Sequence, residues 1–294
     1  MGLSEKLGLR HHDEELSEPP PSYATVPSAA PVAGPSTARP VSQISSYTNG
    51  GLSSLPPFAS MSLHMTDRVR FVDMPPSVTS AVQQIITEYW PRGIQASRPY
   101  GISQEIKLNG TPWSTSGDYG PEAVTSRRLL NRILETLYNH GWIVSLAADI
   151  SKKEMDKNTM IFRYAGTVQP PPREWMSISL SRSDKIRLID APDDLVQAAV
   201  SALGGFNVIK KHGPDDTRSG AYKINLIAPY WVAGGESTMV ARKVVIVLMQ
   251  ALETRGFSVY AAVDQNSGTE GRGVTDVWHC SRLVNSQPMA GFAP

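Results

Sequence analysis

The chain has 294 residues, of which 40% are hydrophobic and 19% are charged, and its formal net charge is +1. So balanced a charge excludes partners held mainly by electrostatics, such as anionic membranes, and we expect no nucleic-acid partner. The longest apolar run, residues 244–249, is far shorter than the ~20 residues of a membrane-spanning helix, so we expect no transmembrane segment. The single cysteine, Cys280, excludes an intramolecular disulfide and favours a reducing compartment, the cytoplasm or alternatively the nucleus.

Residues 1–57 have the composition of a disordered tail. They contain nine of the 23 prolines but only two aromatic residues, so they cannot bury enough apolar surface to offset the loss of chain entropy. Within the tail, Pro20, Pro21 and Tyr23 form a PPxY motif, which resembles the ligands of WW domains. The resemblance implies a WW-domain partner, such as a Nedd-type ubiquitin ligase. The alternative is that a proline-rich tail contains this tetrapeptide by composition alone.

The part of the chain after the tail contains the same pattern twice. Residues 58–75 return without a gap as residues 175–192, and seven of the eighteen positions are identical, where composition alone would give about one. The identical positions are Ser60, Ser62, Leu63, Asp67, Arg70, Asp73 and Pro75, which correspond to Ser177, Ser179, Leu180, Asp184, Arg187, Asp190 and Pro192. We therefore predict two tandem repeats, residues 58–172 and residues 173–294.

Each repeat is predicted to have the element order β-β-α-β-β-α-β-β. Apolar and polar residues alternate in the opening hairpin, and Pro75 and Pro192 separate that hairpin from the first helix. Four strands are expected after this helix in each repeat, at residues 93–97, 105–108, 142–148 and 159–164 and again at residues 206–210, 222–227, 257–263 and 274–280. A longer helix lies between the second and third of them. The pattern predicts an α+β fold with a ferredoxin-like core order in each repeat.

The two longer helices differ in their hydrophobic pattern. Leu130, Ile133, Leu134 and Leu137 form a single apolar stripe, whereas residues 244–249 are apolar on every side. A helix without a polar face is normally enclosed on more than one side. We therefore expect residues 244–249 to pack against their own sheet and also against the first repeat.

Three segments of the first repeat resemble a known family. They are the run from Ile106 to Trp113, the helix start at residues 126–130 and the strand entry at residues 140–142. Residues 58–282 as a whole resemble a duplicated domain of uncharacterised fungal and animal proteins, and this resemblance implies a fold but no activity. The second repeat departs from the pattern at residues 227–231 and at Phe257, which replaces Trp142.

A candidate anion site lies where glycine-containing loops enter the two longer helices, because exposed amides at a helix N-terminus favour negative charge. Its residues are Gly117, Gly120 and Arg127 in the first repeat and Gly234, Gly235 and Arg242 in the second. The helix dipole gives a cation no benefit in these early turns. The alternative is that the arginines are held within their repeats, by a backbone carbonyl or by Asp118, Glu122 or Glu236.

Catalytic and metal-binding patterns receive little support. No histidine forms a metal-spaced pair with another histidine or with the cysteine, so we predict no metal site and no cofactor. His279 and Cys280 are adjacent in a predicted strand and should point to opposite faces, which excludes a thiolate-imidazole pair. Asp149 and Asp264 end equivalent strands, and Asp156 and Asp276 lie near the starts of the strands that follow. Paired carboxylates could bind a divalent cation or act in acid-base catalysis, but aspartate at a strand end commonly closes a turn, and we favour that interpretation.

Three classes of function remain open. The first is a non-catalytic adaptor or scaffold whose tail recruits a WW-domain partner, and it is the one that the motif favours. The second is a module that binds a small ligand, with phosphate or another anion as the expected chemistry. The third is an enzyme, for which the sequence shows no nucleophile and base in a recognisable arrangement.

Overall fold

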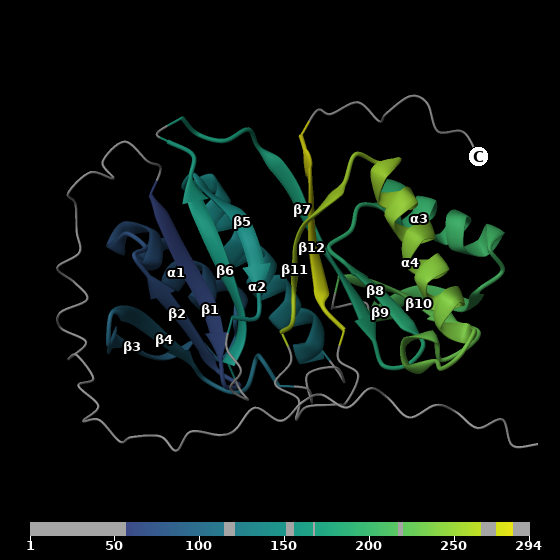
Figure 1. The fold of residues 1–294 in the computed structure, drawn as a ribbon, viewed down its shortest axis with the longest axis horizontal. Coiled ribbons are helices and arrows are strands. Elements are labelled where there is room, and N and C mark those ends of the chain that lie inside the picture. Colours follow the sequence, from purple (N-terminus) through teal and green to yellow (C-terminus); the bar gives the residue numbers. More distant parts are fainter. Residues whose placement is uncertain are drawn as a thin grey trace, which may run out of the picture. The chain divides into compact units, whose positions relative to one another are not determined.

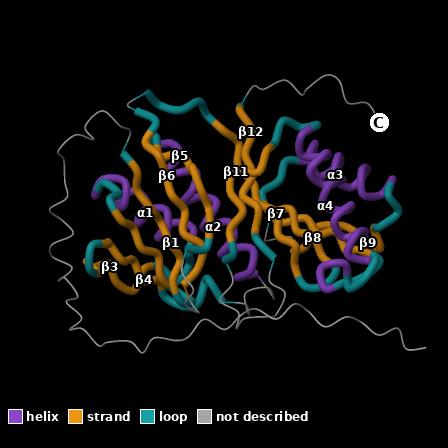
Figure 2. The backbone as a smooth tube through the Cα atoms, viewed as in Figure 1, coloured by secondary structure: helices purple, strands orange, loops and turns teal. Residues whose placement is uncertain are grey.

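The computed structural model describes residues 57–114, 121–150, 156–166, 168–216, 220–265 and 275–284. They form two six-stranded sheets, each covered by helices, in two repeats (Figures 1 and 2). The predicted disordered tail lies outside the described residues. Among the described residues, no helix combines the length and the hydrophobicity that a membrane crossing requires.

The first repeat contains six strands and two helices. The elements are β1 (Phe58–His64), β2 (Arg68–Val72), α1 (Pro76–Tyr89), β3 (Ile94–Tyr100), β4 (Ser103–Leu108), α2 (Pro121–Asn139), β5 (Trp142–Ala148) and β6 (Asp156–Tyr164). The sheet order is β3-β4-β2-β1-β6-β5, and all neighbouring strands are antiparallel.

The second repeat follows the same plan. Its elements are β7 (Arg173–Ser181), β8 (Lys185–Ile189), α3 (Asp193–Gly205), β9 (Ile209–Asp216), β10 (Ala221–Leu226), η3 (Tyr230–Val232), α4 (Ser237–Glu253), β11 (Ser258–Val263) and β12 (Val277–Leu283). The sheet order β11-β12-β7-β8-β10-β9 is the equivalent order read from the other edge. The predicted element order is therefore confirmed in both repeats, with η3 as one short addition in the second.

Both sheets have the split β-α-β arrangement of ferredoxin-like folds, because β4 lies between β2 and β3, the strands that flank α1. The sheet continues beyond β2 with β1, β6 and β5, in that order, in the first repeat. Strand β5 is therefore at the edge of the sheet opposite to β3.

The hydrophobic core of each repeat lies between the sheet and its two helices. Alternate residues of β1 and β2, such as Met61, Leu63 and Phe71, point to this core, and the residues between them point to the other side of the sheet. This other side is called here the open face of each sheet. Burial of the alternating apolar set fixes the strand register, because a slip of one residue would expose it.

Trp113 and Trp231 show that the repeats match even where their sequences diverge. The indole Nε1 of Trp113 donates to the Arg68 carbonyl at 3.1 Å, and that of Trp231 donates to the Lys185 carbonyl at 3.1 Å. The backbone amides of the two tryptophans bond to equivalent carbonyls as well, in Thr66 and Ser183. The sequence departure at residues 227–231 therefore preserves the local structure.

The contact between the repeats is made by α2, and by β5 where it lies against β11, but not by α4, so the prediction for residues 244–249 is wrong. Helix α2 packs on its own sheet and also on β7 and β8, and Figure 1 shows it between the two sheets. Helix α4 contacts α3, η3 and β11, and Ile246 in the middle of the apolar run is 49% exposed. Helix α2 has a second buried face, which is polar and includes Arg127 and Asn131. The hydrophobic pattern of the sequence could not identify this face as buried, because its residues are polar.

Candidate functional site

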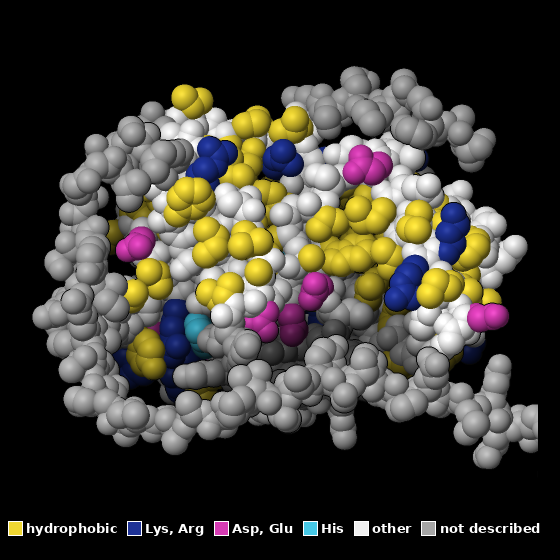
Figure 3. Space-filling model, in the orientation of Figure 1, with side chains coloured by type: hydrophobic (Ala, Val, Ile, Leu, Met, Phe, Trp, Pro, Cys, Tyr) yellow, Lys and Arg dark blue, Asp and Glu magenta, His cyan; other side chains and the backbone are white. Residues whose placement is uncertain are grey.

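The open face of the first sheet carries the densest group of charged side chains on described strands. Arg68 and Arg70 on β2, Arg98 on β3, and Glu105 and Lys107 on β4 point to this side. The alternation with the buried residues Val69, Phe71, Ile106 and Leu108 directs them there. Figure 3 shows hydrophobic side chains over β1, β6 and β5, with Lys and Arg side chains at both ends of that area.

Glu105 is the centre of this group. Its side chain is 0% exposed, and its Oε2 accepts hydrogen bonds from Arg70 Nε at 2.9 Å and Nη2 at 2.8 Å. Its Oε1 accepts from Arg98 Nε at 3.1 Å and Nη2 at 3.0 Å, and Arg68 Nη1 lies 3.5 Å from Oε2. One carboxylate therefore faces three guanidinium groups. Asp67 is a second carboxylate beside them, 3.4 Å from Arg68 Nε and 3.8 Å from Lys107 Nζ. Four basic side chains thus face two carboxylates, and positive charge is in excess.

The arginines also determine the protonation of Glu105. Burial by itself would raise the pKa of this carboxyl group, but hydrogen bonds from Arg70 and Arg98 and the charge of Arg68 lower the pKa below its ordinary value. Glu105 is therefore ionised at neutral pH, and it holds the arginine side chains in a fixed arrangement.

Tyr100 extends the group toward the sheet edge. The guanidinium carbon of Arg70 lies 3.9 Å from the centre of the Tyr100 ring, which is a cation–π contact. The Tyr100 side chain remains 48% exposed. An exposed aromatic ring beside arginine is a common feature of binding surfaces.

The equivalent face of the second sheet is buried by the first repeat. Arg187, the counterpart of Arg70, is 3% exposed and donates from Nε to Asp215 Oδ2 at 2.7 Å. Lys223 Nζ lies 3.3 Å from Asp215 Oδ1, so the carboxylate has moved from the β4 position to β9 while the arginine remains paired. Ser177, Ser179 and Ser181 on β7 are at most 1% exposed. The same surface is thus accessible in one repeat and is internal in the other.

The predicted anion-site arginines have different environments. Arg127 is 3% exposed, and its Nη1 donates to the Ala123 carbonyl at 2.7 Å. Arg242 is exposed, and its Nη1 donates to the Thr238 carbonyl at 3.2 Å. Both side chains thus contact the carbonyl four residues earlier in the helix. This agrees with the alternative that a backbone carbonyl within the same repeat holds each arginine. Burial removes Arg127 from contact with a ligand in solution.

The glycines of the predicted anion site are only partly visible. Gly234 and Gly235 are exposed before α4, and Gly235 has a φ of +57°, which favours glycine. Gly117 and Gly120 lie outside the described residues, as do Pro20, Pro21 and Tyr23 of the PPxY motif. The anion site as a whole therefore stays a prediction.

His279 and Cys280 point to opposite sides of β12, as expected. Cys280 packs in the core beneath α3 and α4, and burial raises the pKa of its thiol to about 12. His279 faces α2, and burial followed by the charge of Arg127 lowers its pKa to about 3. Neither group has the protonation state of a nucleophile or of a general base that accepts a proton near neutral pH.

Acidic groups give no stronger candidate for catalysis. Burial, and then the charge of Asp264, raise the pKa of Asp276 above its ordinary value. Within the described ranges, no three His, Cys, Asp or Glu side chains are grouped as a metal site would require. This pair of carboxylates therefore belongs to no such group among those residues.

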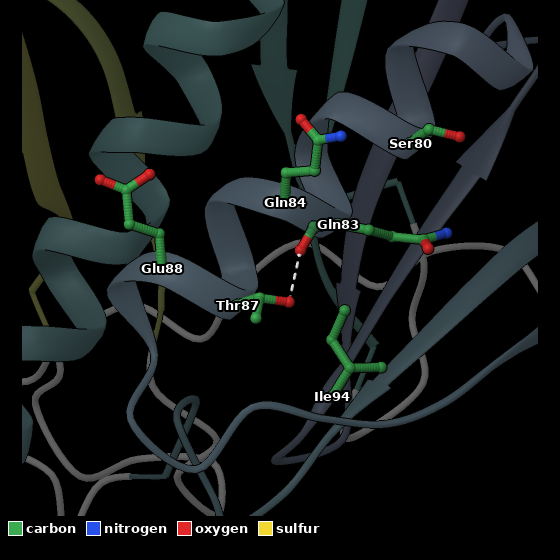
Figure 4. Close-up of a pocket in the computed structure, with 6 residues that line it drawn as sticks. All are labelled: Ser80, Gln83, Gln84, Thr87, Glu88 and Ile94. Carbon is green, nitrogen blue, oxygen red and sulfur yellow. Dashed lines mark hydrogen bonds between the residues drawn. The ribbon is translucent and has the colours of Figure 1, made fainter.

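A shallow depression of about 580 Å³ lies on α1, away from the open face (Figure 4). Its lining consists of Ser80, Gln83, Gln84, Thr87, Glu88 and Ile94. Thr87 Oγ1 donates to the Gln83 carbonyl within the helix at 2.9 Å, so this hydroxyl serves local structure. One carboxylate among amides and hydroxyls does not form an acid-base pair.

A protein-family model of uncharacterised type matches the chain twice, at residues 57–163 and at residues 174–281. Together the two matches cover more than half of the chain. The chain belongs to this family. No curated protein and no solved structure matches it. Each family domain coincides with one six-stranded sheet and its helices, which confirms the tandem duplication.

The two family domains retain the framework of the open face. Arg70 and Arg187 occupy the same strand position, and the Ser62 contact with His64 at 2.7 Å recurs as the Ser179 contact with Ser181 at 2.6 Å. Sequence reasoning did not identify Glu105 as the centre of the group. A signal existed, since charged residues alternate with buried apolar ones on β2 and β4, but strand pairing was needed to bring Arg98 to Glu105.

Proposed function

We propose that the chain is a non-catalytic scaffold protein of the cytoplasm or nucleus. Its tail recruits a WW-domain partner through Pro20, Pro21 and Tyr23, and its core presents the open face of the first sheet to a second partner. One observation supports the role of the core: the same face of the same family domain is buried against a helix in the second repeat. A face whose equivalent in the second repeat packs against a helix is suited to packing against another protein surface.

The charge of the open face also favours a second candidate, an anionic small ligand. Arg68, Arg70, Arg98 and Lys107 surround the two carboxylates of Glu105 and Asp67, so an added phosphate would find unmatched positive charge. This candidate is tested by titrating inorganic phosphate into the full chain and into its Arg98→Ala variant. Arg98 is suited to this test because its side chain is 57% exposed and can be removed without opening the core.

The tail is tested with a WW-domain panel and three full-length proteins: wild type, Tyr23→Ala and Tyr47→Ala. Tyr47 is a matched control because it is the other aromatic residue of the tail and lies outside the PPxY motif. The proposal expects Tyr23→Ala to abolish binding, Tyr47→Ala to bind like wild type, and all three to have the same Tm. Equal binding by wild type and Tyr23→Ala would refute the proposed role of the tail.

A further inference from the structure

Residue positions on α2 and α4 can be compared directly, because the two helices are equivalent. Arg127 and Arg242 make the same contact with the carbonyl four residues earlier, and each helix is followed by a glycine with a positive φ, Gly141 after α2 and Gly256 after α4. The offset between the helices is 115 residues (242 minus 127). Every residue of α2 that contacts the second sheet therefore has a defined counterpart on α4.

The α2 residues that face the second sheet have exposed counterparts on α4. Val124 is 1% exposed and packs against Ile189 and Ala221 of the second sheet, whereas its counterpart Met239 is 60% exposed. Asn131 is 1% exposed, whereas its counterpart Ile246 is 49% exposed. Two large apolar side chains thus lie at the α4 positions that are equivalent to an established interface, where a solvated helix would carry polar residues.

The open face of the first sheet carries exposed apolar residues at positions whose counterparts on the second sheet are buried. Trp175 is 3% exposed in the contact between the repeats, and its counterpart Phe58 is 52% exposed. Ala261 is 5% exposed in the same contact, and its counterpart Leu146 is 52% exposed. Exposed apolar side chains therefore lie at equivalent interface positions on both surfaces, one on the sheet and one on the helix.

The two residues that form an ion pair between the repeats also have oppositely charged counterparts on the exposed surfaces. Arg128 on α2 donates from Nε and Nη2 to both carboxylate oxygens of Asp190, at 2.7 Å and 2.6 Å. The counterparts are Lys243 on α4 and Asp73 after β2, and both are exposed. Asp73 and Asp190 share the same unusual backbone conformation, with φ values of +57° and +55°, so the carboxylates have the same starting direction.

We infer that the open face of the first sheet binds α4 of a second copy of the chain. This contact repeats between molecules the contact that α2 makes with the second sheet within one molecule. Met239 and Ile246 of one copy pack on the sheet near Phe58 and Leu146 of the next, and Lys243 pairs with Asp73. The inference rests on the proposed function, since it names the partner of the face proposed there.

The contact joins two different surfaces, so it does not close on itself after two copies. A heterologous contact of this kind forms head-to-tail assemblies, either rings where the rotation between copies closes or open chains where it does not. Each added copy would present one more PPxY tail, and several tails on one assembly would raise the avidity for a partner that carries more than one WW domain. Self-assembly would thereby strengthen the recruitment that a single tail provides.

The test uses four full-length proteins in analytical ultracentrifugation over a range of concentrations. They are wild type, Ile246→Glu on the helix surface, Leu146→Glu on the sheet surface, and Val168→Glu as a control. Val168 is 82% exposed in the segment between the repeats, outside both surfaces. All three substitutions place a charge at an exposed position, so each variant is expected to fold.

Wild type and Val168→Glu are expected to rise in weight-average mass with concentration, from 32.0 kDa to values beyond the dimer. Ile246→Glu and Leu146→Glu are each expected to remain at 32.0 kDa. An equimolar mixture of these two variants is expected to give dimers and nothing larger, because each contributes one intact surface. Lys243→Glu is expected to weaken association about tenfold through loss of the ion pair with Asp73.

Three results would overturn the inference: a wild-type mass that stays at the monomer value, assembly of Leu146→Glu like wild type, or a mixture that remains monomeric. WW-domain binding is measured on the same proteins and is expected to be equal for all four at the lowest concentration. Failure of assembly with intact Tyr23-dependent binding would count against the inference alone, and loss of that dependence would count against the proposed role of the tail.

Discussion

The two repeats have the same fold but use the open faces of their sheets differently. Arg70 on the first sheet has an 18% exposed side chain, whereas the equivalent Arg187 on the second sheet is 3% exposed, on the face that packs against the first repeat. Duplication of the domain therefore turned one copy of the surface into an internal contact and left the other at the end of the core. In the second repeat this surface packs against a helix, α2.

The internal contact is unusually polar for a buried interface. Ser126, Arg127 and Asn131 of α2 are each at most 6% exposed, and they face a sheet surface that carries Ser177 and His279. Buried polar groups are costly unless they are hydrogen-bonded, and among the described residues Asn131 Oδ1 and His279 Nε2 are buried without a hydrogen-bond partner. The polar contact is therefore only partly satisfied. The following substitutions compare buried positions with their exposed counterparts.

The largest effect is expected from the matched pair Trp175→Ala and Phe58→Ala. Trp175 packs edge-on against Tyr138 and Tyr260, with ring centres 5.6 Å and 4.8 Å apart. Removal of this buried side chain should lower the free energy of unfolding by about 4 kcal/mol. Phe58→Ala should cost less than about 1 kcal/mol because half of that side chain is already in solvent. Urea unfolding of both variants at neutral pH measures the difference, and equal losses would contradict the assignment of the interface.

The next effect concerns pH, through His279. Burial and the nearby Arg127 lower the pKa of His279 to about 3, whereas an unfolded histidine titrates near its ordinary value of 6.5. The unfolded state therefore binds a proton that the folded state does not, and stability is retained above pH ~6.5 and lost as pH falls toward ~3. Between pH 6 and pH 4 this group should contribute up to about 1.4 kcal/mol per pH unit.

The variant His279→Ile tests this contribution, because Ile161 occupies the equivalent position in the first repeat. Urea unfolding at several pH values should show a smaller loss of stability on acidification for His279→Ile than for wild type. His140, which is exposed, provides the control substitution His140→Gln. Identical pH dependence for wild type and His279→Ile would show that His279 is not held neutral.

A smaller effect is expected from the ion pair between the repeats. Asp190→Asn keeps a residue that tolerates a positive φ, but it removes the charge that Arg128 binds at 2.6 Å and 2.7 Å. The free energy of unfolding should fall by about 2 kcal/mol. Asp73→Asn, the exposed counterpart, should change it by less than about 0.5 kcal/mol at concentrations where the chain is monomeric. Thermal or urea unfolding of both variants decides whether the difference exists.

Much of the fold could be predicted from the sequence, because local patterns determine it. The alternation in residues 58–65 gives the direction of each side chain, and Pro75 and Pro192 mark where the hairpin ends and the helix begins. Because residues 58–75 and 175–192 share identical positions, the secondary structure predicted for one repeat also applies to the other. These patterns all involve residues close together in the sequence, so they can be interpreted without knowledge of the tertiary structure.

The contact between the repeats could not be predicted in the same way. Hydrophobicity pointed to residues 244–249, but the helix that is buried on two sides is α2, whose second face carries Arg127 and Asn131. A polar residue is normally a sign of solvent, and only the partner surface reveals that these two are enclosed. The group around Glu105 was missed for a related reason, since its residues come from β2, β3 and β4 and are joined only by strand pairing.

The central claim is that one open face is accessible and the other is covered, and thiol labelling tests it most directly. Ser62→Cys and Ser179→Cys place a cysteine at equivalent positions, of which Ser179 is 1% exposed. Native Cys280 provides a low background, because burial raises the pKa of its thiol to about 12. At concentrations where the chain is monomeric, Ser62→Cys should react with a disulfide reagent at least about a hundredfold faster than Ser179→Cys. Equal rates in the folded protein would contradict the claim.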